Sequence, residues 1–95
     1  MNSTISDAID QKNLLTFFYD GGARTVEPYC YGIGTKGHEL LRGYQIDGYS
    51  SSGKLGWRLF KVADMSSIET EGSFEANRPD YKKGDKQIPN IFNEI

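Results

Sequence analysis

The stretch GWRLFKVADMSSI, residues 56–68, combines aromatic and β-branched residues with one arginine and then a turn. It predicts a barrel strand followed by the loop into the next strand. Side chains alternate between the two faces of a strand, so Trp57 and Leu59 point one way while Arg58 and Phe60 point the other. Both faces are largely apolar, and we expect this strand to be covered on both sides.

Arg58 is the residue in this stretch that does not suit a buried strand. A guanidinium at the start of a strand can reach a cleft while its aliphatic stem lies along apolar surface. Arg58 is therefore the first candidate for a ligand contact. The alternative is an ion pair with a neighbouring carboxylate on the barrel rim.

Composition places the whole chain in the all-β class. Its 95 residues fit one small domain, and 11 glycines, 13% aromatic residues and two methionines favour strands and tight turns over a helical bundle. The net charge of -2 argues against a protein that coats nucleic acid through bulk charge. Residues 1–61 carry 7 basic and 6 acidic side chains (+1), and residues 62–95 carry 4 and 7 (-3), so a local basic patch fits the first part.

Cys30 is the only cysteine, which excludes an intrachain disulfide and a cysteine-based metal cluster. The first residues lack the apolar core of a signal peptide. No stretch approaches the roughly 20 apolar residues that cross a bilayer. We expect a cytoplasmic protein with no membrane contact.

Turn signals divide the first 72 residues into one helix and five strand-like segments. Residues 4–12 predict a short amphipathic helix lying across one end of a barrel, because Ile5, Ala8 and Ile9 share a face. Five strand-like runs within about 70 residues predict a bent antiparallel sheet closed into a small barrel. The runs are residues 14–20, about 24–27, 38–48, the strand from Trp57, and a short strand around Ile68 that ends at Gly72.

The segment CYGIGTKG, residues 30–37, contains three glycines between two strand-like runs. A dinucleotide-binding loop opens a helix, and no helical pattern follows this segment. We predict a hairpin loop here. Pro28 is expected to end the regular pairing of the strand before it.

Residues 73–95 differ in composition, with charged residues interleaved and few apolar ones until the end. We expect residues 1–72 to form the barrel domain and residues 73–95 an extension, pinned to the barrel by Phe74 and Tyr81. The closing apolar residues are close to helical spacing: Ile88, Ile91, Phe92 and Ile95. The alternative is a frayed tail over the last dozen residues.

Several of these segments together resemble the WYL domain family over about residues 5–70. They are the Ile/Ala helix, a strand ending Phe-x-Tyr, Arg-Thr-Val-Glu-Pro, Leu-Leu-x-x-Tyr and Trp-Arg-Leu-Phe-Lys-Val. The resemblance implies a small Sm-like barrel and a sensing role in bacterial or phage transcription regulation, with binding of nucleic acid or nucleotide-like ligands. Tyr19, Arg24 with Pro28, and Arg58 with Phe60 match the family's motif positions.

The sequence departs from the family where the name-giving Trp-Tyr-Leu stands, because His38-Glu39-Leu40 keeps only the leucine. No helix-turn-helix pattern precedes the barrel in these residues. A partner that carries a DNA-binding domain on a separate chain is therefore one expectation.

The candidate ligand site consists of one aromatic and three forked cations, namely Tyr19, Arg24, Arg42 and Arg58. Arginine forks match phosphate geometry and tyrosine offers a stacking face, so the expected ligand is a nucleotide or single-stranded nucleic acid. In the alternative, these arginines pair with Glu27, Glu39 and Asp47, and the barrel works through protein contacts as a homodimer or with a separate regulator.

Catalysis is not expected. His38 and Cys30 are the only histidine and cysteine, and no orienting third group stands beside them in the pattern. A single histidine without acidic residues at ligand spacing gives no metal site. No cofactor is predicted.

Overall fold

A computed structural model describes all of residues 1–95. The first element is the helix α1, Ser3–Gln11, whose N-terminus is capped by the Asn2 side chain accepting from the Ile5 amide. Its buried face consists of Ile5, Ala8 and Ile9, as the spacing predicts. The helix ends where Lys12 adopts a left-handed conformation with φ 55°.

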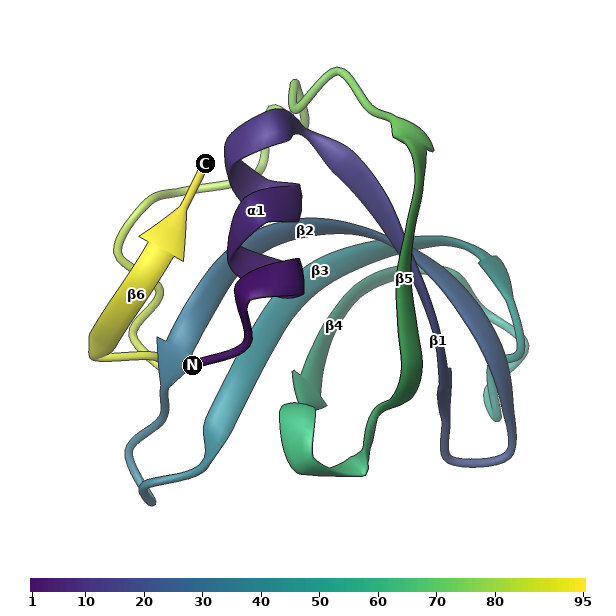
Figure 1. The fold of residues 1–95 in the computed structure, drawn as a ribbon, viewed down its shortest axis with the longest axis horizontal. Helices are drawn as coiled ribbons and strands as arrows, with labels where there is room; N and C mark the ends of the chain where they lie inside the picture. The colour runs from purple at the N-terminus through teal and green to yellow at the C-terminus, as the bar shows by residue number, and fades with distance from the viewer.

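Six strands form one antiparallel sheet that curls around a core (Figure 1). They are β1 Asn13–Tyr19, β2 Gly22–Ile33, β3 Glu39–Gly48, β4 Gly56–Lys61, β5 Ser66–Ser73 and β6 Asn90–Glu94. The order is β4-β3-β2-β1-β5, with β6 added to the far end of β2. A 3-10 turn, η1 Val62–Asp64, connects β4 to β5. The fold is therefore a small all-β, barrel-like one with a short N-terminal helix.

The interior is largely apolar, and α1 closes one side of it (Figure 1). Phe60 of β4 makes edge-to-face contacts with Phe17 and Tyr19 of β1, at centroid distances of 5.1 and 5.0 Å. The buried core residues are Ile5, Ala8, Ile9, Leu15, Phe17, Val26, Tyr31, Leu41, Phe60 and Met65. Other side chains of β2, β3 and β4 point away from this core, among them Tyr29, Arg42 and Trp57. The face of the sheet that they form is called here the outer face.

β2 is much longer than the predicted residues 24–27. Residues 22–26 pair with β1, residues 24–33 pair with β3, and residues 30–33 pair with β6. Pro28 lies between the parts that pair with β1 and β6 and beside a register shift toward β3, a position that tolerates a residue without an N–H.

The predicted hairpin loop over residues 30–37 is accordingly wrong in its first half. The turn itself is short and is closed by the Gly34 amide donating to the His38 carbonyl at 2.8 Å and the Gly37 amide donating to the Gly34 carbonyl at 3.0 Å.

The near-helical spacing of the apolar residues at the chain's end is also misleading, because residues 90–94 form the strand β6 and not a helix. β1 pairs with β2 only as far as Val26, so the same edge of β2 is free from Cys30 onward to receive another strand. Gly32 permits the close approach: a Cβ there would lie 2.2 Å from the Asn90 carbonyl oxygen.

Residues 74–89, called here the strap, connect β5 to β6 without helix or strand. The strap packs on the outer face, where Phe74 and Tyr81 both contact Tyr29. Ile88 near its end is fully buried. α1 has nine residues, and no helix of the structure has the length and apolarity needed to cross a membrane.

Candidate functional site

Arg24 lies inside the barrel and is 6% exposed. Its guanidinium carbon sits 5.3 Å from the Tyr19 ring centroid, 5.5 Å from that of Tyr49 and 5.9 Å from that of Phe60. It donates to the Tyr19 carbonyl at 3.0 and 3.2 Å and to Gln45 Oε1 at 3.3 Å. Arg24 and Tyr19 are therefore brought together, but as a packing contact between a buried guanidinium and a partly buried ring.

Arg58 holds the connection between β3 and β4. Its Nη2 donates to Ser50 Oγ at 2.6 Å, to Ser52 Oγ at 3.3 Å and to the Lys54 carbonyl. No carboxylate pairs with Arg58, so the rim ion pair considered from the sequence is absent. The side chain orders this serine-rich loop.

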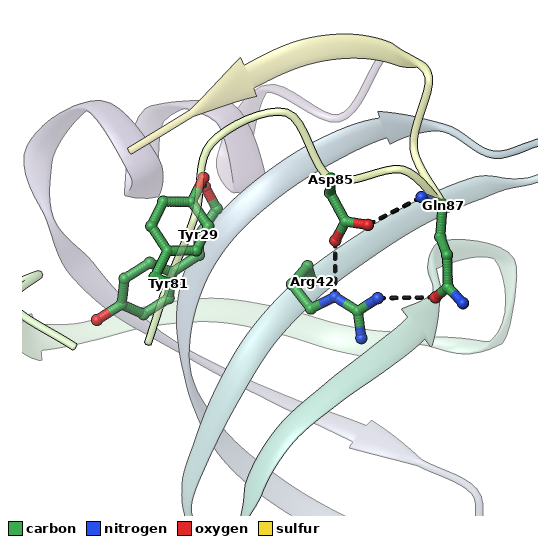
Figure 2. A network of polar contacts seen from close by, with 5 residues as sticks. All are labelled: Tyr29, Arg42, Tyr81, Asp85 and Gln87. Carbon is green, nitrogen blue, oxygen red and sulfur yellow. Dashed lines mark hydrogen bonds and ion pairs between the residues drawn. The ribbon is translucent and has the colours of Figure 1, made fainter. Parts of the chain in front are cut away.

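Arg42 projects from β3 onto the outer face, since its neighbour Leu41 points into the core. Its Nε donates to Asp85 Oδ2 at 2.7 Å and its Nη2 to Gln87 Oε1 at 2.7 Å, as Figure 2 shows. Burial opposes ionisation of Asp85, but the hydrogen bond from Arg42, the Gln87 amide and the Arg42 charge together lower its pKa. Arg42 is thus separated from Arg24 by the sheet.

A pocket of about 230 Å³ opens on the outer face between β3, β4 and the strap. Two of its lining residues are bonded to each other, because the Trp57 indole N–H donates to Asp80 Oδ2 at 2.6 Å. Trp57 and Tyr81 lie nearly parallel, with ring centroids 6.0 Å apart and an interplanar angle of 25°. The lining consists of two cations, two carboxylates and two aromatics: Arg42, Trp57, Asp80, Tyr81, Lys82 and Asp85.

Tyr29, fully buried behind the pocket, fixes both aromatics. Its ring lies 4.9 Å from Trp57 and 4.8 Å from Tyr81, and its carbonyl accepts from the Tyr81 hydroxyl at 3.2 Å. Figure 2 shows Tyr29 and Tyr81 beside the Arg42 network. Burial, followed by the charge of Glu27 and the hydrogen bond to it, raises the pKa of Tyr29 to about 12.

A second ion pair ties the strap to the sheet beside this pocket. Arg78 donates through Nε and Nη2 to the two Glu27 oxygens, each at 3.1 Å, and Glu27 also accepts from the Tyr29 hydroxyl at 3.1 Å. The Arg78 guanidinium lies 3.7 Å from the Tyr44 ring centroid. Such a bidentate, stacked arginine has a defined geometry that a lysine would not reproduce.

The pairing of the barrel arginines with Glu27, Glu39 and Asp47 considered from the sequence is wrong. Glu27 is occupied by Arg78 of the strap, Glu39 accepts from the Tyr31 hydroxyl at 2.6 Å, and Asp47 accepts from the Gly48 amide at 2.8 Å.

Cys30 and His38 occupy unlike surroundings. Cys30 is fully buried, and burial with the nearby charges of Glu94 and Asp85 raises the pKa of its thiol to about 12, so the nucleophilic thiolate is scarce near neutral pH. His38 is exposed in the β2–β3 turn. No three His, Cys, Asp or Glu side chains gather closely enough to hold a metal ion.

Comparison with protein-family models, with curated proteins and with solved structures finds no match. Assignment of function therefore depends on the geometry of the chain itself.

Of the four residues predicted from the sequence, only Arg42 lines the pocket. Trp57 stood in the stretch that predicted the fold, yet there it signalled only an apolar strand face. The strap supplies the other lining residues of the pocket. Because the strap is neither helix nor strand, no periodic pattern of apolar residues in the sequence predicts its path across the sheet.

Proposed function

We propose that this chain is a non-catalytic sensing module that binds a nucleotide, free or as one unit of a single strand, in the outer-face pocket. The observation that carries the proposal is the joint lining of that pocket by Arg42, Lys82, Trp57 and Tyr81. Cations that meet phosphate oxygens beside aromatic rings that stack on a base are the usual recognition set for such ligands.

Three polar groups in the pocket have free donors or acceptors for such a ligand. Arg42 engages Asp85 and Gln87 through Nε and Nη2, which leaves Nη1 to donate to a phosphate, and Lys82 makes no hydrogen bond or ion pair. Asp80 accepts one bond from Trp57 and has a second oxygen for the amino group of a base.

The lining carries two positive and two negative groups, so its charge sums to zero. This balance favours a ligand with an anionic end and an N–H-bearing end over inorganic phosphate. A volume of about 230 Å³ lies below the roughly 300–1,000 Å³ of typical small-molecule sites, which limits the occupant to a single nucleotide unit.

The proposal keeps the resemblance to WYL domains and the role in transcription regulation that it implies. It moves the ligand contacts away from Tyr19, Arg24 and Arg58, because those side chains make internal contacts. A separate chain with a DNA-binding domain stays the proposed partner.

The test is thermal stabilisation by nucleoside monophosphates and short single-stranded oligonucleotides, since a ligand that binds only the folded state raises the melting temperature. Lys82→Ala should weaken the stabilisation, and added salt should weaken it in the wild type. The matched control is Lys83→Ala, an exposed neighbour outside the lining. No stabilisation by any member of the panel, or equal stabilisation of both variants and the wild type, would reject the site.

A second candidate, the protein-interaction barrel, is favoured by β5. This strand pairs with β1 alone, and seven of its eight residues are exposed. Phe18, which pairs with Ser66 of β5, is 54% exposed beside it. An unpaired edge next to apolar surface is a template for another chain. Sedimentation over a wide concentration range should then show a dimer that Phe18→Ser weakens; a monomer throughout would remove this form of the candidate.

A further inference from the structure

The strap is attached to the sheet in an unusual way for a segment between two strands. From residue 75 to residue 89 its backbone hydrogen bonds close only its own turns, Tyr81 to Arg78 at 3.2 Å and Ile88 to Asp85 at 3.0 Å. Its ends are fixed, because the Phe74 amide donates to Lys12 and β6 pairs with β2. The segment between these ends is held by side chains alone.

Those side-chain contacts are mostly polar and aromatic. In chain order they are Arg78 to Glu27, Asp80 to Trp57, Tyr81 to Tyr29, and Asp85 with Gln87 to Arg42. Ile88 is the one aliphatic anchor that is fully buried. Segments with few buried apolar contacts open at a smaller free-energy cost than the core does.

The barrel core does not include the strap. None of the ten residues of the buried core cluster lies between residues 74 and 89. Lifting of the strap would therefore uncover Tyr29, Tyr44 and Trp57 on the outer face and leave the interior packing in place.

The pocket, in contrast, exists only while the strap is docked. Arg42 and Trp57 come from the sheet, whereas Asp80, Tyr81, Lys82 and Asp85 come from the strap. A ligand that contacts both walls binds the docked form and has no complete site in the lifted form.

We propose that the strap is the ligand-responsive element of this protein: it exchanges between docked and lifted positions, and occupancy of the pocket by a nucleotide holds it docked. The proposal rests on the proposed function, since it assigns the regulation of that same site. A ligand shifts such an equilibrium by its differential affinity for the two positions, and the apparent affinity falls with the fraction of molecules that are docked.

If ligand binding is coupled to docking of the strap, Arg78 acts as a positioning residue. Arg78 does not line the pocket, yet its bidentate contact with Glu27 fixes the strap two residues before Asp80. Loss of this contact should lower nucleotide affinity by roughly tenfold through the docked fraction alone.

Trp57 is the only tryptophan, and it lies under the strap, so its fluorescence reports docking. The experiment measures acrylamide quenching of Trp57 and the rate of tryptic cleavage after Lys82 and Lys83, with and without adenosine monophosphate. Arg78→Ala should raise both quenching and cleavage without ligand, with cleavage roughly tenfold faster, and saturating ligand should lower both in the wild type. Lys86→Ala, an exposed strap residue, is the matched control and should behave as the wild type.

The outcomes separate the two proposals. If Arg78→Ala binds nucleotide with unchanged affinity, the coupling is overturned and the binding site stands. The same holds if nucleotide binds but changes neither Trp57 quenching nor cleavage. Fast strap cleavage in Arg78→Ala together with no binding of any nucleotide to the wild type overturns the proposed function, and the coupling with it.

Discussion

The arginines of this chain have different roles that follow from their partners. Arg42 and Arg78 pair with carboxylates and connect the strap to the sheet, whereas Arg24 has no carboxylate and is held by rings and carbonyl oxygens inside the barrel. Arg58 is bonded only to neutral oxygens of the loop that it orders. Residue type alone does not distinguish these environments.

These contacts predict unequal effects of truncating the barrel arginines. Arg24→Ala should lower the free energy of unfolding by about 2–4 kcal/mol, because it leaves a gap between aromatic rings and removes the donor to Gln45 Oε1. Arg58→Ala should cost about 1 kcal/mol, since its loop partners can turn to water. Urea unfolding of both variants measures the difference. Equal losses would show that Arg24 is not the buried packing residue described above.

At the scale of elements, the local sequence pattern was sufficient to predict a helix or strand wherever its apolar residues recur with helical or strand periodicity. The helix, predicted over residues 4–12, spans Ser3–Gln11, and the strand predicted over residues 38–48 spans Glu39–Gly48. β2 could not be predicted to its full length because its second half depends on pairing with β3 and β6, which are distant in sequence. A proline and a glycine there signal a strand's end locally, and long-range pairing overrides that signal.

The candidate site shows the same division. Trp57 and Arg42 lie on strands that the sequence predicted, so their outer-face direction follows from alternation with Phe60 and Leu41. Their contacts with Asp80 and Asp85 depend on the path of the strap, which has no regular structure. The two lining residues on the sheet were therefore accessible from the sequence, and the four contributed by the strap were not.

The whole molecule consists of a largely apolar interior, which also holds Arg24 and Gln45, and a second, hydroxyl-bearing aromatic layer under the strap. Three ionisable groups of β2 are buried in the molecule without charge. Tyr29, Tyr31 and Cys30 are each fully buried, and the pKa of each is raised to about 12. Burial is the largest cause for all three, followed by Glu27 for Tyr29, the Glu39 hydrogen bond for Tyr31 and Glu94 for Cys30.

This arrangement predicts that the fold loses stability in alkali. Unfolded thiols and phenols ionise near pH 9 and 10, respectively, while the folded groups keep their protons to about pH 12. The folded state therefore binds more protons in that window, so the stabilisation is complete below about pH 9 and falls as pH rises toward 12, by up to about 1.4 kcal/mol per pH unit for each group. Urea unfolding between pH 8 and 11 measures the fall, and Tyr29→Phe should make it shallower above about pH 10. A free energy of unfolding that stays constant across this range would contradict the burial of these three groups in their protonated form.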